Sequence, residues 1–187
     1  MKKCYEMEIA GLKRELPLFD ISDTTEIAAF IIFGDVELTV HCAAELLKLA
    51  PEYDVMMTAE AKSIPLIHEM ARQAGKNEYI IARKGPKLYM EDILTVNVKS
   101  ITTSKEQILC IGKKEKDMIA GKRVLIVDDV ISTGESLAAI EELVKQAGGT
   151  VAGKMAVLAE GDAIERKDIT VLAPLPLFDA EGNPKTL

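Results

Sequence analysis

Cysteine and histidine are scarce in this sequence of 187 residues, which contains three cysteines and two histidines. The cysteines, Cys4, Cys42 and Cys110, are odd in number and are not spaced like paired or metal-binding cysteines. Their pattern argues against a disulfide framework and against a zinc site, and it is typical of a protein with reduced thiols. His41 and His68 lie in predicted helices without a second metal-type ligand at a suitable spacing, so we expect both to be structural.

The sequence also lacks long apolar runs and an excess of basic residues. No apolar stretch approaches the roughly 20 residues that span a membrane, and the N-terminal residues lack the uninterrupted apolar core of a signal peptide. The formal net charge of -7 and the pI of about 5.0 disfavour a protein that gains affinity by neutralising nucleic-acid phosphates. We therefore expect a soluble, cytoplasmic protein that binds neither membrane nor nucleic acid.

The sequence does contain enough apolar material for one hydrophobic core. It is 48% hydrophobic and 28% charged, and no internal repeat, low-complexity tract or flexible linker divides it. We predict a single domain over residues 1–187. Residues 1–34 form an N-terminal segment without a clear pattern, residues 35–175 form the core, and residues 176–187 form a tail.

Helical and extended patterns alternate along the core. Apolar residues recur at helical spacing after Asp35, a good N-cap, and again after Ser63, which can cap a second helix. The short apolar runs between the helical patterns are typical of buried strands. This alternation predicts an α/β fold with a mostly parallel sheet flanked by helices. The expected helices are 36–50, 64–74 and 137–147; the expected strands are 54–59, 78–83, 124–130, 151–158 and 169–173; segments 94–102 and 107–111 should form a hairpin or flap, and KKEK, 113–116, a solvated turn.

The most informative segment is VLIVDDVISTGES, residues 124–136. Its apolar start predicts a buried strand that carries Asp128 and Asp129 to the edge of the sheet where open parallel sheets bind ligands. The small residues that follow open a helix, whose first N–H groups lack intrahelical partners and carry the positive end of the helix dipole. Acceptors for sugar hydroxyls and donors for an anion are what a ribose carrying a phosphate requires. The phosphate donors would be the N–H groups of Ser132, Thr133, Gly134, Glu135 and Ser136, with hydroxyl groups added by Thr133 and Ser136.

Asp128 and Asp129 are adjacent in an extended segment, so their side chains should not point the same way. We expect one to face the ligand and the other to face a neighbouring amide, cation or bridging water. Two simpler interpretations of the segment also exist. VLIVDD begins receiver domains too, although only 58 of the 187 residues follow Asp129 and a receiver needs most of its domain there. Ser132 and Glu135 fit the capping box S-x-x-E, which would compete with phosphate for the same N–H groups.

Segment 124–136 closely resembles the phosphoribosyl-pyrophosphate binding motif of the type I phosphoribosyltransferases, a fold with a small hood that residues 1–34 would form. TAEAKS, 58–63, is similar to the pyrophosphate loop of the purine members, and ARKGPKL, 82–88, to their Arg-Lys loop. IIFGDVELT, 31–39, resembles the segment of adenine phosphoribosyltransferases whose aromatic residue covers the base. The resemblance implies pyrophosphate binding by Glu60, Ala61, Lys62, Arg83, Lys84 and Lys87, and base binding by Phe33, Gly34 and Val130.

The resemblance also implies an activity, which is transfer of the 5-phosphoribosyl group from phosphoribosyl pyrophosphate to a purine base in purine salvage. Adenine is the first choice of base, and the products are a nucleoside monophosphate and pyrophosphate. Asp128, Asp129 and Lys87 would be the catalytic residues. Mg²⁺ would enter with the donor, with water-mediated contacts to Asp128 and Asp129 as one option. A flap over residues 93–105 would exclude water, and the family suggests a homodimer.

Several positions depart from the family pattern. Gly34 stands where adenine enzymes have Arg, and Lys62 and Ser63 stand where the pyrophosphate loop has Arg and Gly. Glu135 replaces the second Gly of the phosphate loop. The flap segment, 96–111, lacks the Tyr-x-x-Glu-Tyr pattern that supplies a catalytic glutamate, and it is more similar to xanthine phosphoribosyltransferases and related purine repressors. The alternatives are therefore a xanthine-, hypoxanthine- or guanine-type enzyme, a non-catalytic purine-responsive regulator that binds phosphoribosyl pyrophosphate, and a catalytically idle subunit.

Overall fold

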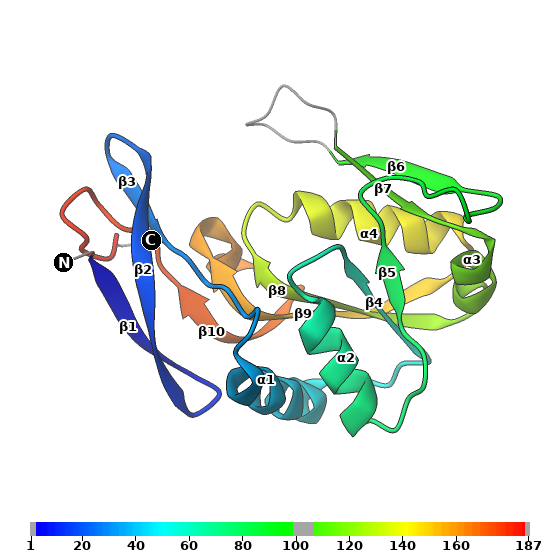
Figure 1. The fold of residues 1–187 in the computed structure, drawn as a ribbon, viewed down its shortest axis with the longest axis horizontal. Helices are drawn as coiled ribbons and strands as arrows, with labels where there is room; N and C mark the ends of the chain where they lie inside the picture. The colour runs from blue at the N-terminus through cyan, green and yellow to red at the C-terminus, as the bar shows by residue number, and fades with distance from the viewer. Residues whose placement is uncertain (1–2, 99–106, 186–187) are drawn as a thin grey trace.

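The chain folds around one parallel β-sheet of five strands, as a computed structural model describes it for residues 3–98 and 107–185 (Figure 1). The strand order is β10–β9–β8–β4–β5, and every neighbouring pair is parallel. The α/β fold with a mostly parallel sheet is thereby confirmed. The strands are β4 (Val55–Ala59), β5 (Ile80–Ala82), β8 (Arg123–Ile131), β9 (Thr150–Glu160) and β10 (Thr170–Leu175).

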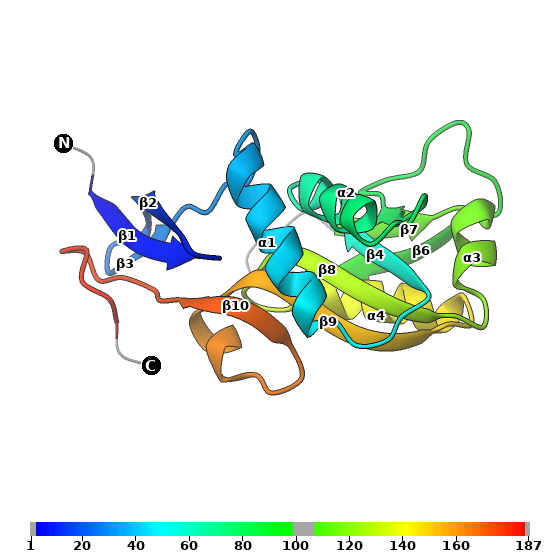
Figure 2. The ribbon, with the colours of Figure 1, turned by 90° about the horizontal axis from the view of Figure 1, so that it is seen from below.

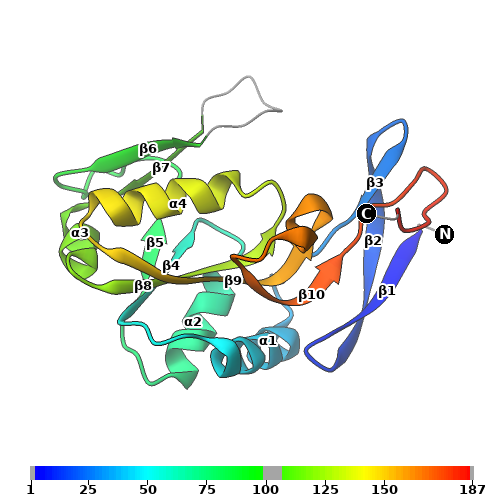
Figure 3. The same cartoon turned by 180° about the vertical axis from the view of Figure 1, so that it is seen from behind.

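Helices cover both faces of this sheet. On one face lie α1 (Val36–Leu49) and α2 (Ile64–Gln73), and on the other lies α4 (Glu135–Gln146). An antiparallel hairpin of β6 (Leu94–Val98) and β7 (Gln107–Ile111) packs against the outer side of α4 (Figure 3). A short helix, α3 (Lys113–Ile119), leads from this hairpin into β8, and a 3₁₀ helix, η1 (Gly161–Glu165), follows β9.

Alternating residues of the strands fill two hydrophobic cores, one on each face of the sheet. Met56 is fully buried with Leu125 against α1 and α2, whereas Met57 is fully buried with Ile126 on the side of α4. Side chains on a strand alternate between its two faces, so neighbouring methionines serve different cores. Both methionines are core residues, as expected from the sequence.

The N-terminal segment is an antiparallel sheet rather than irregular chain. Its strands are β1 (Cys4–Ile9), β2 (Leu12–Ser22) and β3 (Thr25–Ala28), in that order, and it stands at one end of the molecule (Figure 2). The tail packs against this small sheet. Phe178 is fully buried, its ring centroid lies 4.9 Å from that of Tyr5, and its backbone exchanges two hydrogen bonds of 2.9 Å with Glu26.

Two local predictions differ from the structure: one, for residues 113–116, is wrong, and the other, for residues 94–102, lies partly outside the described residues. KKEK is not a solvated turn, because it begins α3; Glu115 accepts the N–H of Gly112 at 2.9 Å and so satisfies a donor that the helix start leaves open. The expected extended segment 94–102 is a strand as far as Val98, and residues 99–102 lie outside the described residues. Among the helices of the described ranges, none combines the length and the apolar character that crossing a bilayer requires.

Candidate active site

Four neighbouring parallel strands end at one edge of the sheet, and each carries a polar segment there. Glu60 follows β4, Arg83 follows β5, Asp128 and Asp129 lie near the end of β8, and Glu160 ends β9. A cavity of about 250 Å³ opens at this edge. The predicted site residues that line it are Glu60, Ala61, Lys62, Lys84, Asp128, Asp129, Val130 and Ser136.

The two carboxylates of β8 converge on one hydroxyl group. Ser63 Oγ lies 2.5 Å from Asp128 Oδ1 and 3.2 Å from Asp129 Oδ1, and it accepts the backbone N–H of Asp129 at 2.9 Å. The expectation that the two acids face apart does not hold at this hydroxyl, which both approach, whereas the expectation that one acid faces a neighbouring cation agrees with the contact of Asp129 Oδ2 to Lys62. Ser63 is the N-cap of α2 and is almost fully buried.

Burial and like charge change the protonation of this pair. Asp129 is 3% exposed and Asp128 is half buried. Loss of solvation, together with the adjacent Asp129 carboxylate, raises the pKa of Asp128 to about 7. Keeping both carboxylates charged is therefore unfavourable in this site, and a cationic sugar or a metal cation beside them would stabilise the charged form.

Lys62 faces the buried acid. Its Nζ lies 2.8 Å from Asp129 Oδ2, while half of the lysine side chain stays exposed. This ion pair lacks hydrogen-bond alignment, and Asp129 Oδ2 makes no hydrogen bond within residues 3–98 and 107–185. The oxygen therefore has an unused acceptor position at the cavity.

Glu60 joins the predicted pyrophosphate loop to the predicted Arg-Lys loop. Its Oε2 accepts the backbone N–H of Lys84 at 3.0 Å and lies 3.4 Å from Arg83 Nε. The Glu60–Ala61 peptide is cis. Arg83 is also fixed to β7, because it exchanges two backbone hydrogen bonds of 2.8 Å with Cys110. The two loops and the hairpin are thus held together beside the acids.

The turn between β8 and α4 is open to an anion. Gly134 occupies the N-cap of α4 with a φ of 79°, which suits glycine, and no side chain caps the helix. The N–H groups of Thr133, Gly134 and Ser136 have no partner in the described part of the chain, and that of Glu135 lies 3.5 Å from Thr133 Oγ1. The capping-box interpretation is wrong, because Ser132 precedes the N-cap and its hydroxyl bonds Glu160 instead.

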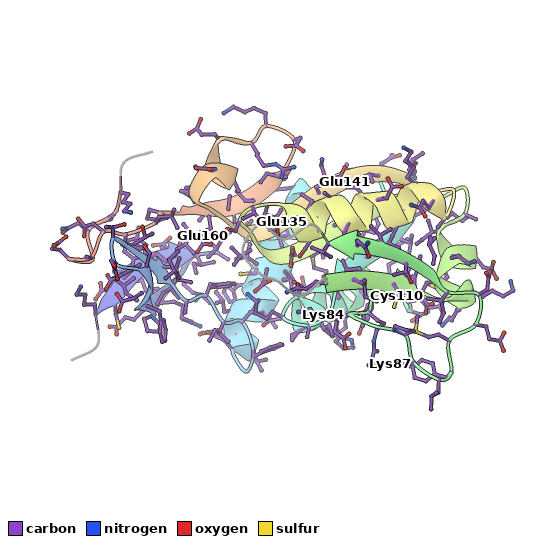
Figure 4. All side chains as sticks on the ribbon, turned by 90° about the horizontal axis from the view of Figure 1, so that it is seen from above. Lys84, Lys87, Cys110, Glu135, Glu141 and Glu160 are labelled. Carbon is purple, nitrogen blue, oxygen red and sulfur yellow. The ribbon has the colours of Figure 1, made fainter. Side chains whose placement is uncertain are left out.

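Two residues at this turn escaped the sequence analysis. Burial raises the pKa of Glu160, and the hydrogen bond from Ser132 and the charge of Lys62 oppose that rise. Figure 4 shows Glu160 near Glu135 at the start of α4. The guanidinium of Arg166, held by Asp168 at 2.8 and 3.0 Å, lies where a Cβ at Gly134 would collide with it. Glu160 lies two residues beyond the predicted strand 151–158, at the edge where the strands of a parallel sheet end, so it could have been found from that position, whereas no pattern marks Arg166.

Other predicted residues lie away from the cavity lining. Phe33 is 50% exposed, and Gly34, with a φ of 81°, borders a separate groove between α1 and α2. Lys87 is exposed on the loop after β5, apart from Glu160 and Glu135 (Figure 4). The hairpin supplies part of the cavity wall through Val98 and residues 107–109, and residues 99–105 of the predicted flap lie outside the described residues.

Comparison with known proteins agrees with this geometry. Residues 41–175 match the phosphoribosyl transferase domain family. The chain is 35% identical over 120 residues to an adenine phosphoribosyltransferase of Bifidobacterium longum, which covers 63% of the chain and 58% of the relative. It is 31% identical over 122 residues to a xanthine phosphoribosyltransferase of Bifidobacterium adolescentis, covering 64% and 62%. The matched part thus spans about three fifths of the length of these two relatives.

Among solved structures, the adenine phosphoribosyltransferase of Saccharomyces cerevisiae, in complex with an imino-altritol bisphosphate and adenine, has the same fold. The TM-score is 0.62 at 22% identity, with 84% of this chain and 92% of that chain covered. The fold, the order of the three loops and the family match lead to one conclusion. The chain belongs to the phosphoribosyl transferase domain family, in the purine branch of its type I fold.

Proposed function

We propose that this protein is a purine phosphoribosyltransferase, which transfers the 5-phosphoribosyl group from phosphoribosyl pyrophosphate to a purine base, with adenine as the first choice. One observation carries the proposal. The acid pair of β8, the basic loop after β4 and Ser136 in the first turn of α4 line one cavity at the carboxyl edge of the sheet. Thr133 and Gly134, whose N–H groups have no partner in the described part of the chain, come just before Ser136 and line an adjoining groove. These are acceptors for sugar hydroxyls, a cation for pyrophosphate and donors for a 5-phosphate.

The reaction separates charge at the anomeric carbon of the ribose. As the bond to pyrophosphate breaks, the sugar gains positive character and the leaving group gains negative charge. Asp128 and Asp129 bind the ribose hydroxyls and stabilise the cationic sugar, while Lys62 and Lys84 stabilise the leaving group. Fixed groups of this kind are worth roughly 2.7 to 4 kcal/mol each. A ring nitrogen of the base is the nucleophile, so the proposed reaction needs no side-chain nucleophile.

Mg²⁺ is part of the proposal, and the acid pair suits it. Magnesium prefers hard oxygen ligands and keeps several of its waters, and Asp129 Oδ2 is a buried carboxylate oxygen with an unused acceptor position. Asp128 and Asp129 would hold the ion through water. When bound with the donor, it would neutralise charge on the pyrophosphate.

The base site is the least constrained part of the proposal. Val130 lines the cavity and would pack on one face of the purine, and Phe33 would have to turn inward to cover the other. Both the adenine and the xanthine enzymes are similar to this chain, so a xanthine-, hypoxanthine- or guanine-type enzyme is the second candidate. Lys87 would contact the donor only if its loop closed over the cavity. The homodimer and the cytoplasmic location stay predictions.

Pyrophosphate release tests this proposal. The full chain would be incubated with Mg²⁺, phosphoribosyl pyrophosphate and adenine, hypoxanthine, guanine or xanthine in separate reactions. We expect release with adenine above the other three bases. Release with a different purine would correct the base, and tight donor binding without release with any base would favour the regulator or the idle subunit.

A further inference from the structure

Ser63 occupies a position where serine normally caps a helix. It is the N-cap of α2 and is 1% exposed. An N-cap hydroxyl usually accepts an N–H from the first turn, which stabilises the helix. The Ser63 hydroxyl makes no such bond, so α2 forgoes its cap. A local rule broken in this way is typical of a functional position.

The hydroxyl is used on the acid pair instead. A hydroxyl has one proton, and Ser63 donates it to Asp128 Oδ1, its shortest contact at 2.5 Å. The same oxygen accepts the backbone N–H of Asp129 at 2.9 Å, and that N–H also lies 2.9 Å from Asp128 Oδ1. These three groups form a closed set of hydrogen bonds that fixes the Asp128 carboxylate against the backbone of β8.

This arrangement has a physical purpose in a ribose site. Two adjacent carboxylates in a buried place repel one another, and either could rotate away unless a donor holds it. A hydroxyl that donates to Asp128 offsets part of the repulsion and fixes the direction of that carboxylate. Acceptors that are already in place bind sugar hydroxyls better than acceptors that must first be ordered.

We propose that Ser63 is a positioning residue, which fixes the Asp128 carboxylate and the backbone of Asp129 so that the acid pair can bind the hydroxyls of the ribose. The proposal rests on the proposed function, because it assumes that the acids bind a sugar. It separates the two halves of the donor: the ribose depends on Ser63, whereas the pyrophosphate depends on Lys62 and Lys84.

Calorimetric titration of the full chain with Mg²⁺ and three ligands separates these halves. The ligands are phosphoribosyl pyrophosphate, ribose 5-phosphate and pyrophosphate. In Ser63→Ala we expect the affinity for both ribose ligands to fall about tenfold, the size expected when a hydrogen bond to a charged group is lost. The affinity for pyrophosphate should stay unchanged. Ser63→Thr, which keeps the hydroxyl, should restore most of the ribose affinity.

Thr39→Val is the matched control. It removes another buried hydroxyl, which donates to the carbonyl of Asp35 at 2.7 Å on α1, without touching the acids. All three affinities should be unchanged in this variant. If Ser63→Ala does not fold, Ser63→Gly removes the same hydroxyl and takes its place.

The outcomes distinguish this inference from the proposed function. Ribose ligands that bind Ser63→Ala as tightly as the natural protein, or a loss that affects pyrophosphate equally, would overturn the role of Ser63 alone. A natural protein that binds neither ribose ligand would overturn both.

Discussion

Residues at the cavity differ in how far the fold depends on them. Asp129 is almost fully buried and touches Lys62, whereas Lys87 is exposed on a loop. Replacing a buried charge disturbs its neighbours as well as the chemistry, because an unpaired partner remains. The effect of a substitution at this cavity must therefore be measured on both folding stability and ligand affinity.

Asp129→Asn should abolish turnover far more than it harms folding. The amide keeps the shape of the side chain and the backbone contacts to Ser63, but it loses the negative charge that the cationic sugar needs. We expect the rate of pyrophosphate release to fall at least about 100-fold, with only a few degrees of change in Tm. Parallel activity and thermal unfolding measurements check this, and an equal loss of both would make the acid structural.

The lysines should rank by their distance from the acids. Lys62→Met removes a cation that lines the cavity, so it should weaken binding of phosphoribosyl pyrophosphate more than Lys87→Ala does. Neither change should alter the affinity for the base. Lys48→Ala, on the exposed side of α1, serves as a control in the same titrations. A larger effect of Lys87→Ala would mean that its loop closes onto the donor.

The roles of some of these residues are predictable from the sequence, and the roles of others are not. Asp128 and Asp129 are predictable because an apolar run must end at the ligand-binding edge of a parallel sheet. The role of Ser63 is not predictable from the sequence, since a helix cap and a contact to β8 use the same hydroxyl. Only the packing of α2 against β8 decides between them.

At the scale of elements, the turn between β8 and α4 carries the proposed anion site. Its glycine, Gly134, has a left-handed conformation and lies against Arg166. The opposite end of the same helix has a similar glycine: Gly148 has the same φ of 79° but open space around its Cβ position. Substitutions at Gly134 and Gly148 can therefore be compared as a matched pair.

Gly134→Ala should weaken donor binding, and Gly148→Ala should not. Both place a Cβ in the left-handed region, which costs about 1 to 2 kcal/mol of folding stability. Only the first also pushes against the guanidinium of Arg166, beside the N–H groups that are proposed to bind the phosphate. We expect about a tenfold loss of affinity for ribose 5-phosphate in Gly134→Ala, measured by calorimetry. Unchanged affinity in both variants would place the phosphate elsewhere.

Elements with a strong apolar period are predictable, and weakly patterned ones are not. The helices after Asp35 and Gly134 and the strands of the main sheet follow their patterns closely, because one face of each packs on a core. Helix α3 was missed because four charged residues open it and Ile119 alone is fully buried. Strand β2 was missed because much of it is exposed and a proline interrupts it.

At the scale of the whole molecule, the N-terminal sheet of β1–β3 and the tail after β10 pack together, and no described residue of either lines the cavity. Phe178 lies between the small antiparallel sheet and the core, although it belongs to the last residues of the chain. The expected tail therefore has a clear place, which its prolines and apolar residues alone did not reveal.

Phe178→Ala should destabilise the protein without weakening donor binding. Removing a fully buried phenyl ring costs about 3 to 5 kcal/mol, which for a chain of this size lowers Tm by about 10 °C. Phe19→Ala, at a side chain 42% exposed on β2, should cost much less. Thermal unfolding measures both, and calorimetry should show unchanged affinity for phosphoribosyl pyrophosphate. Equal effects of the two variants would mean that the tail is not part of the folded core.

The contact between the N-terminal sheet of β1–β3 and the core should make the free energy of unfolding depend on pH. Arg14 on β2 holds Asp35, the N-cap of α1, through bonds of 2.6 and 3.0 Å, and these bonds lower the pKa of Asp35 below its usual value of 3.8. A depressed pKa means that folding favours the charged carboxylate. The stabilisation is therefore complete above about pH 5 and declines as the pH falls through 4 and below.

Asp35→Asn isolates this contribution. The amide oxygen can still accept the N–H of Leu38, which caps α1, so the change removes the charge and leaves the cap in place. We expect the free energy of unfolding, from urea titrations, to differ most between the natural protein and this variant at pH 7, with the difference shrinking toward pH 3. Asp20→Asn, at an exposed position on β2, should change the free energy of unfolding much less. A difference for Asp35→Asn that stays constant with pH would show that the charge of Asp35, and so its ion pair with Arg14, does not cause the pH dependence.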